Sequence, residues 1–539
     1  MLRFVRLGMR RTNRFQGHFA VLAAMAALAL GSGASSCNLV VDTDVAQCET
    51  TADCAAKGPE FADAVCSEKV CVLGDCTTNA ECSARFGGEP AICRRPGRIC
   101  VQLTTPECTE VVPAEALAED QTVVLGFIGP LSGTDIQSGK PPWEGVKLAL
   151  NELEQTAVGL PVKGTTQRRR LAVLACDDST DPNVVAKHLA ENVRAPLIIG
   201  PAFSSVTLEI ATKITIPAGS LLMSYSATSP AITDLADNGL VWRIPPSDAL
   251  QAIPMAKLVS EFETQIRADQ SIPGTTPIKV AMTVLGDAYG TGLANAASGL
   301  IQFNGKGAND NGNNFLRVDY KPDTKDFKPT VSTVLAQAPQ IVVLVGTTEA
   351  VESIFAGLKA DPNANKRIYL FSDGGKIEQL LTSAGALRPN VFGTAPGRET
   401  PQYQAFQSRF KAQNQNKVPG SYAEHAYDAT YLAAYALVAT SEQTASGIAM
   451  IDGLSRSVGG AKIVAGPSQV NTAFAALLEP GGKINYDGVS GLLDFDVKKG
   501  EAPADIDVWC ITSAGAFTSS GQFFNSVTNK VEGARTKCN

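Results

Sequence analysis

The chain is poor in the residues that enzymes most often use for proton transfer and nucleophilic attack near neutral pH. It has three histidines in 539 residues, of which only His188 and His425 lie beyond residue 36. Both fall in helical patterns, where a packed or surface histidine is the ordinary outcome. No Gly-x-Ser-x-Gly nucleophile elbow occurs either. These absences favour a protein that is not an enzyme.

Positive charge is scarce as well. The 46 Lys and Arg residues are outnumbered by 53 Asp and Glu, giving a formal net charge of −7, and no basic stretch with interleaved aromatics occurs. This composition argues against a nucleic-acid partner. The segment Gly133 to Lys140 resembles a phosphate-binding loop, but its glycines are one residue too far apart and Pro141 follows the lysine. We expect neither a cofactor nor a metal ion.

Long apolar runs are missing except near the amino terminus. The chain begins with several arginines and continues into an apolar run of about a dozen residues, Phe19 to Leu30. That run is too short to span a membrane, so it predicts an export signal over residues 1–36. The next segment, Ala34-Ser-Ser-Cys37, resembles the lipobox of bacterial lipoproteins, although Ala34 stands where Leu is usual. We predict lipid attachment at Cys37, with ordinary cleavage nearby as the alternative.

Cysteine is concentrated in one segment. Of the 13 cysteines, nine lie between positions 48 and 108, and eight of these form two similar four-cysteine repeats. Each repeat has about 25 residues, too few to bury a core, so cross-links worth ~2 to 4 kcal/mol each must stabilise it. A metal site is the alternative, but zinc ligands favour closer Cys-x2-4-Cys pairs. We predict a disulfide module over residues 37–108, with bonds among Cys48, Cys54, Cys66, Cys71, Cys76, Cys82, Cys93 and Cys100.

Four cysteines remain outside these repeats and Cys37. We expect Cys510 and Cys538 to tie the carboxyl-terminal tail to the final strand. That assignment leaves Cys108 and Cys176 as a pair.

After the module, the chain alternates between apolar strands and helical patterns. Residues 109–121 are acidic and rich in alanine and are predicted to be a linker. The first strand is expected at Thr122 to Ile128. The helix after it repeats apolar residues every 3.6 positions, from Trp143 to Leu153, and should expose Glu144, Lys147 and Glu152. Such alternation predicts parallel sheets flanked by helices, the α/β class.

Small hydroxyl residues follow two predicted strands about twenty residues apart. Ser204 comes after Pro196 to Ile199, and Ser226 and Thr228 come after Ser220 to Met223. In an open parallel sheet, ligands bind at the carboxyl ends of the strands, where backbone N–H groups and helix amino termini attract anions. The alternative is that these residues only cap helices.

Nine short motifs in one order carry a resemblance to a known family. Over roughly Thr122 to Trp509 the chain resembles the Leu/Ile/Val-binding type of periplasmic solute-binding protein. The motifs are Gly126 to Gly133, Trp143 to Gly145, Cys176 to Asp178 with Asp181-Pro182, Gly200-Pro201, Ser226 to Pro230, Arg243 to Asp248, Asp287 to Gly290, Tyr427 to Ala429, and Tyr486 to Gly491.

The resemblance implies a type I fold of two lobes, each a parallel sheet flanked by helices, within residues 122–539. Lobe 1 should comprise about 122–250 and 400–484, and lobe 2 about 251–399 and 485–539. The chain would then cross between lobes near Pro245, Thr400 and Ile484. Three crossings make a hinge between rigid lobes that close on a ligand.

The resemblance also implies a function and a location. We expect an exported protein of the periplasm or cell envelope that binds an amino acid or related small polar solute. Its partners would be the permease and ATPase of an ABC importer, and its only membrane contact would be the lipid anchor. A ligand sensor or cell-envelope scaffold with the same fold is the alternative.

Particular residues match the family's ligand site. Ser204 and Thr228 match the positions that hold a ligand carboxylate, and Ser226 and Ala227 line the same strand end. Asp373 matches the acceptor of the ligand ammonium and, in an open cleft, should be hydrated. The remaining expected site residues are Tyr289, which should close over the ligand, Tyr422, which should line the pocket, and Ser138 and Thr348, which replace two tyrosines of the branched-chain binders.

Loss of those two aromatic walls predicts a wider or more polar pocket. We also expect the cysteine module to be separable from the ligand site. A chain starting near Glu119 should then fold and bind.

Overall fold

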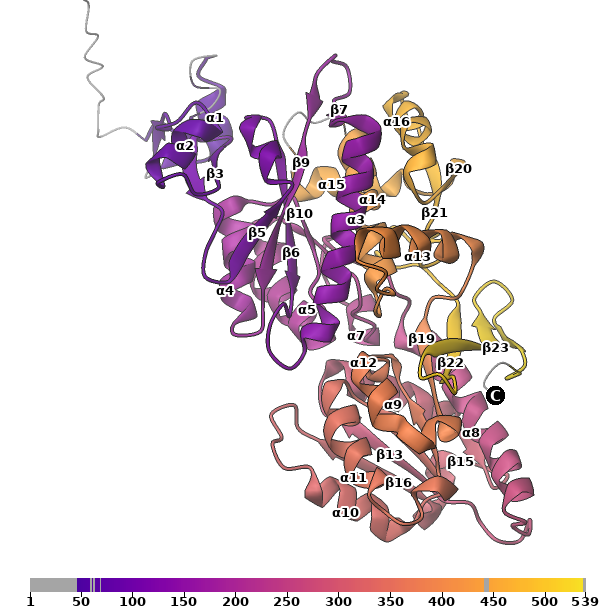
Figure 1. Ribbon diagram of the computed structural model, residues 1–539. Coiled ribbons are helices and arrows are strands. Elements are labelled where there is room, and N and C mark those ends of the chain that lie inside the picture. The colour runs from indigo at the N-terminus through magenta and orange to yellow at the C-terminus, as the bar shows by residue number, and fades with distance from the viewer. Residues whose placement is uncertain (1–45, 59–60, 62–63, 68, 441–444, 537–539) are drawn as a thin grey trace, which may run out of the picture.

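The computed structural model describes residues 46–58, 61, 64–67, 69–440 and 445–536. The predicted export signal and Cys37 lie outside these residues. Figure 1 shows a small amino-terminal module beside an upper lobe, with a second lobe below. Within the described residues, no helix combines the length and the apolar character needed to cross a membrane.

The small module contains two repeats of one design, each a short helix followed by a two-stranded hairpin. The first has α1 (Thr51–Ala55), β1 (Val65–Ser67) and β2 (Val70–Val72), and the second has α2 (Asn79–Arg85), β3 (Ala91–Arg94) and β4 (Ile99–Gln102). Each repeat joins its first cysteine to its third and its second to its fourth. The bonds are Cys48–Cys66, Cys54–Cys71, Cys76–Cys93 and Cys82–Cys100. The prediction of a disulfide module is confirmed, and these sulfurs are not free to hold a metal ion.

Lobe 1 is built on a six-stranded sheet in the order β12-β11-β10-β6-β9-β5. All neighbours are parallel except the edge pair β9 and β5. Helices α3 and α14 cover one face, and α4 and α5 cover the other. The bounds are β12 (Val241–Arg243), β11 (Leu221–Ser224), β10 (Leu197–Ile199), β6 (Val123–Gly129), β9 (Leu171–Asp177), β5 (Cys108–Val112), α3 (Lys140–Ala157), α4 (Pro182–Lys187), α5 (Ser204–Ile210) and α14 (Ala423–Ala439).

Lobe 2 has an eight-stranded sheet in the order β16-β13-β17-β18-β19-β22-β23-β24. Strands from β16 to β19 in that order run parallel, and the last three join antiparallel. The bounds are β13 (Val280–Leu285), β16 (Phe315–Tyr320), β17 (Ile341–Val345), β18 (Ile368–Phe371), β19 (Val391–Pro396), β22 (Ile506–Ile511), β23 (Phe517–Asn525), β24 (Lys530–Gly533), α8 (Asp248–Asp269), α9 (Ala288–Leu300), α10 (Lys328–Gln337) and α12 (Glu378–Ala384). Cys510 in β22 is disulfide-bonded, whereas Cys538 lies outside the described residues.

The chain passes between lobes three times. The first two passages lie between β12 and α8 and between β19 and α13 (Pro401–Gln413). The third was expected near Ile484, which is wrong. Ile484, Phe495 and Ala502 pack in the core of lobe 1, so the chain reaches lobe 2 only at β22. The apolar side chains of this segment pack it against α14. The sequence patterns did not indicate this packing.

The segment predicted to be a linker is part of lobe 1. Strand β5 pairs antiparallel with β9, and the Cys108–Cys176 disulfide joins the two strands. Val111 and Ala116 are buried in the core beneath this edge. The pairing of Cys108 with Cys176 is confirmed, but the expectation of a spacer is wrong because residues 109–121 complete the sheet and cover its edge.

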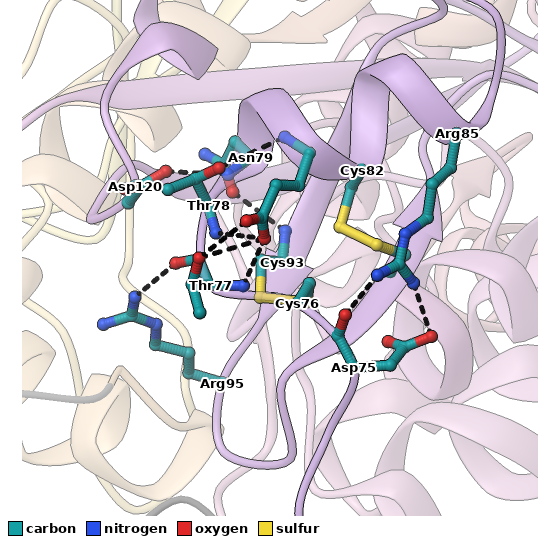
Figure 2. The surroundings of a disulfide bond; sticks show 12 residues. Asp75, Cys76, Thr77, Thr78, Asn79, Cys82, Arg85, Cys93, Arg95 and Asp120 are labelled. Carbon is teal, nitrogen blue, oxygen red and sulfur yellow. Dashed lines mark hydrogen bonds and ion pairs between the residues drawn. A yellow bond between two sulfur atoms is a disulfide. The ribbon is translucent and has the colours of Figure 1, made fainter. Parts of the chain in front are cut away.

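The second cysteine repeat docks on this same segment (Figure 2). The Asn79 amide donates to the carbonyls of Leu117 and Glu119, both at 3.1 Å, and its backbone N–H donates to Asp120 Oδ1 at 2.7 Å. Asn79 Oδ1 accepts from the Cys93 N–H at 2.9 Å. A single buried side chain therefore fastens the disulfide-bonded repeat to lobe 1. The module and lobe 1 share an interface, which a separable module would lack.

One expected surface residue is buried. Glu152 on α3 was expected to be exposed, but its carboxylate accepts from Tyr427 Oη at 2.5 Å and from Tyr431 Oη at 2.8 Å. Arg409 Nε donates to it at 2.7 Å. Helices α13 and α14 thus supply the partners that a buried carboxylate requires.

A chain starting at Glu119 should be destabilised rather than fold normally. It would lose β5, expose the edge of β9 and leave Cys176 as a free thiol. Loss of the disulfide alone should cost about 2 to 5 kcal/mol. The matched control is a chain starting at Thr104, which also lacks the module but keeps β5 and the Cys108–Cys176 bond. In urea unfolding, the chain starting at Glu119 should have a clearly lower midpoint than the chain starting at Thr104. Equal midpoints would contradict this structural role of β5.

Candidate functional site

Asp373 lies at the centre of a hydrogen-bonded cluster where the two lobes meet. It follows β18 and begins the short helical turn Asp373–Gly375. Its Oδ1 accepts from Gln251 Nε2 at 2.8 Å and from Tyr289 Oη at 2.7 Å. Its Oδ2 accepts from Tyr422 Oη at 2.5 Å. Asp373 is buried and has three donors in this arrangement of the lobes, so its hydration in an open cleft stays a prediction.

Three different elements position these donors. Gln251 lies in the first turn of α8, directly after the first passage between the lobes. Tyr289 lies in the first turn of α9, whose amino terminus is capped by Asp287 accepting from the Gly290 N–H at 2.8 Å. Tyr422 precedes α14 in lobe 1 with a left-handed backbone, φ 66°. The Tyr422 hydroxyl therefore bridges lobe 1 to the carboxylate of lobe 2.

Further hydrogen bonds join the lobes at the amino end of α9. Ser205 Oγ of lobe 1 donates to Asp287 Oδ2 at 2.8 Å. Ser229 Oγ donates to the Ala288 carbonyl at 2.8 Å. The lobes are therefore in direct contact beside Tyr289, and the cluster around Asp373 is enclosed by both.

The predicted hydroxyl residues lie at the carboxyl ends of β10 and β11, but most are used internally. Ser204 Oγ accepts from the Ser229 N–H at 3.2 Å, and Ser226 Oγ donates to the Ala202 carbonyl at 2.8 Å. The Ala227 N–H donates to Ser224 Oγ at 2.9 Å. Neither Ser204 nor Thr228 caps a helix, because Phe203 and Ser229 occupy the cap positions of the following helices.

Two further predicted residues, Ser138 and Thr348, also have no described bond to Asp373 or its donors. Ser138 ends the turn Ile136–Ser138 in lobe 1, where its carbonyl accepts from Tyr225 Oη at 3.3 Å. Thr348 is buried after β17 in lobe 2. The structure thus brings Tyr289, Asp373 and Tyr422 into direct contact. Thr228 has no described hydrogen bond to these three residues.

Sequence reasoning missed Asp248 as a site residue, although it ends one of the quoted motifs. Asp248 begins α8 and is fully buried, and its backbone N–H donates to the Thr228 carbonyl at 2.9 Å. Neither of its carboxylate oxygens accepts a well-formed hydrogen bond from the described residues, although the Thr228 side chain lies close enough to lower the pKa of Asp248, and Gln251 Oε1 also has no partner there. A buried carboxylate without a donor is rare. No sequence signal distinguishes Asp248 from an ordinary aspartate at a helix start.

The surroundings of Asp248 are acidic. Burial raises the pKa of Asp248 well above its usual range, and the neighbouring Asp373 carboxylate raises it further. The nearest cation, Arg243, is occupied by Glu501 Oε2 at 3.0 Å and by the Ser229 carbonyl at 2.7 Å. Burial likewise raises the pKa of Tyr289 and of Tyr422, so both hydroxyls remain donors. The site offers surplus acceptors and suits a group rich in N–H donors.

Residues 122–478 match the protein family described as "Periplasmic binding protein". The match covers more than half of the chain, and the chain belongs to this family. An amino acid binding protein of Pseudomonas aeruginosa is 24% identical over 284 residues, which are 52% of this chain and 64% of that relative. The alignment thus spans less than two thirds of that relative's length.

Two solved structures show the same fold. LivJ, the branched-chain amino acid transporter substrate-binding protein of Streptococcus pneumoniae, in complex with isoleucine, has a TM-score of 0.56 at 18% identity and aligns over 74% of this chain and 98% of LivJ. A solute-binding protein of an ABC transporter from Rhodopseudomonas palustris HaA2, in complex with p-hydroxybenzoic acid, has a TM-score of 0.56 at 15% identity over 77% and 98%. The predicted family and the type I, two-lobed α/β fold are confirmed.

Replacing Asp248 with Asn should stabilise the ligand-free protein at neutral pH. Folding raises the pKa of Asp248. The stability contributed by its protonated form is therefore fully present below the pKa in the unfolded chain, about 3.9. That stability is lost as pH rises through the pKa in the folded protein. Asn stays neutral throughout, so the advantage of the variant should grow with pH. Urea unfolding at about pH 5 and about pH 8 measures this difference.

A matched control is Asp428→Asn. That buried carboxylate accepts from Tyr486 Oη at 2.8 Å, from the N–H groups of Val489 and Ser490, and from Ser490 Oγ at 2.6 Å. An amide would place donors against these donors and should destabilise the fold. Destabilisation by Asp248→Asn at both pH values would contradict the absence of partners around Asp248.

Proposed function

We propose that this protein is an extracytoplasmic solute-binding protein that closes two lobes on an amino acid or related small polar solute carrying an amino group. The observation that carries this proposal is the acidic cluster enclosed by both lobes, with Asp373 at its centre and Asp248 beside it. The ligand's ammonium would meet these carboxylates. Ser204 and Thr228, at the strand ends of lobe 1, with Ser226 and Ala227 beside them, would face its carboxylate.

The two solved relatives offer different ligand classes to compare. Isoleucine carries an ammonium, whereas p-hydroxybenzoic acid ionises to a carboxylate and has no cationic group. An anion beside two buried carboxyl groups would be repelled at low dielectric, and nothing would neutralise Asp248 or Asp373. The acidic cluster therefore supports the amino acid class for this chain. Ser138 and Thr348, small where the branched-chain binders carry tyrosine, favour a larger or more polar side chain.

Delivery to the permease and ATPase of an ABC importer is part of the proposal. Its support is the family and the transporter assignment in the names of both solved relatives. Attachment through a lipid on Cys37 would hold the protein at the membrane in the periplasm or cell envelope.

A ligand sensor or cell-envelope scaffold is the second candidate. One observation favours it, namely the disulfide module docked on lobe 1 through Asn79, which offers additional surface for a protein partner. Adjacent permease and ATPase genes would support import, and an adjacent kinase or synthase gene would support the second candidate.

Asp373→Ala should weaken binding of an amino acid ligand by about a hundredfold or more. Breaking a buried ion pair costs ~3 to 5 kcal/mol, and ~1.4 kcal/mol is tenfold in affinity. The ligand is chosen from a thermal-shift screen of the common amino acids and 4-hydroxybenzoate, and affinities are then measured by calorimetric titration. The control is Asp319→Ala, an exposed carboxylate of the same lobe that pairs with Arg317.

The ligand-free Asp373→Ala variant should also be less stable than the wild type. Three donors lose their acceptor, namely Gln251, Tyr289 and Tyr422. Titrations therefore have to be made well below the variant's own melting temperature. Unchanged affinity in the folded variant, or preferential binding of 4-hydroxybenzoate, would remove the amino acid ligand from consideration.

A further inference from the structure

The donors and acceptors around Asp373 do not balance. Three donors of the cluster point at Asp373, whereas both carboxylate oxygens of Asp248 and Oε1 of Gln251 are buried without a well-formed hydrogen bond among the described residues. The Thr228 hydroxyl, which can donate as well as accept, acts on Asp248 and lowers its pKa. Asp248, Gln251 and Thr228 are 0%, 1% and 1% exposed. A group that binds here and brings N–H donors would give these acceptors partners.

Asp248, Gln251 and Thr228 form one locus. Asp248 and Gln251 are one turn apart on α8, and the Asp248 N–H binds the Thr228 carbonyl at 2.9 Å. Gln251 in turn donates to Asp373 at 2.8 Å, which places the Asp373 carboxylate beside the same first turn of α8. An ammonium has three N–H donors and can satisfy Asp248, Gln251 and Thr228 together.

The charges around this locus come from several elements. Asp373 follows β18, Asp287 caps α9, and Arg243 on β12 is a cation that acts on Asp248. Arg243 is already bound to Glu501, Ser229 and Thr233. Tyr289 and Tyr422 are donors to Asp373. Burial and the neighbouring Asp373 carboxylate raise the pKa of Asp248 well above its usual range, so without a cationic partner Asp248 favours its protonated form.

We propose that the ligand's ammonium exchanges for this proton, so that Asp248 is a specificity-determining residue that accepts a cationic amine only by releasing a proton. The inference rests on the proposed function, since it requires a ligand between the lobes. The exchange balances. A carboxylic acid and an alkylammonium become a carboxylate–alkylammonium pair and one proton in solution. No bond to carbon changes, and no further reactant is needed.

Two consequences separate this exchange from simple ion pairing. Affinity for an amine-bearing ligand should rise with pH, by at most about tenfold per pH unit, below the raised pKa of Asp248. The sign follows because a bound ammonium favours the ionised Asp248 carboxylate and lowers that pKa. Ligands without an amine cannot neutralise the carboxylate and should bind poorly at every pH.

Isothermal titration calorimetry of the full chain tests the exchange. The probe is the amino acid giving the largest thermal shift among the common L-amino acids, with 4-hydroxybenzoate as the amine-free comparison. Titrations at about pH 6 in several buffers of different ionisation enthalpy give the number of protons released from the slope of heat against that enthalpy. We expect a release of up to one proton per ligand and an affinity that rises with pH.

Asp248→Asn should abolish both the proton release and the pH dependence and should weaken binding. The matched control is Asp507→Asn, a buried carboxylate on β22 whose pKa is also raised by burial and which binds Ser519 Oγ at 2.6 Å. That variant should release protons as the wild type does.

The outcomes separate the two proposals. Amino acid binding with no proton release from the wild type overturns the exchange but leaves the proposed function standing. Proton release that persists in Asp248→Asn overturns the role of Asp248. Failure of every amino acid in the screen to bind, or preference for 4-hydroxybenzoate, overturns the proposed function and the exchange with it.

Discussion

Two carboxyl groups buried side by side at the junction of the lobes constrain the rest of the site. Asp373 accepts from three donors on three elements, whereas Asp248 has no comparable set of donors among the described residues. Because burying a poorly paired carboxylate is costly, this arrangement is one that a cationic group would relieve. Both lobes and the helix that begins at the first passage between them contribute to it. In the proposed function, ligand binding and lobe closure would therefore depend on the same groups.

The two sheets hold this junction in place. Each lobe has its own core, and polar residues reach the junction from strand ends and helix starts. The disulfide module adds to lobe 1, because Asn79 binds the segment that covers the edge strand β5. Lobe 1 and the module together form a larger unit than lobe 1 alone. The Cys108–Cys176 disulfide secures β5, the strand next to the module.

Local patterns in the sequence predicted the elements and their order well. The cysteine repeats, the apolar spacing of α3 and the strand-end hydroxyls depend on neighbouring residues, which a sequence displays directly. The errors concern distant partners. Glu152 is buried because Tyr427 and Tyr431 arrive from a helix far along the chain, and the segment after Ile484 stays in lobe 1 because of its own buried side chains. The isolation of Asp248 could not be predicted, because it consists in the absence of a donor in three dimensions.

A crystal structure of the protein with its best amino acid ligand tests the central claim most directly. The ammonium nitrogen should lie within hydrogen-bonding distance, about 2.7 to 3.2 Å, of Asp248 and should also face Asp373. The ligand carboxylate should lie toward the ends of β10 and β11, near Ser204 and Thr228. A ligand whose carboxylate faces the two aspartates, or one bound outside the junction of the lobes, would contradict the claim.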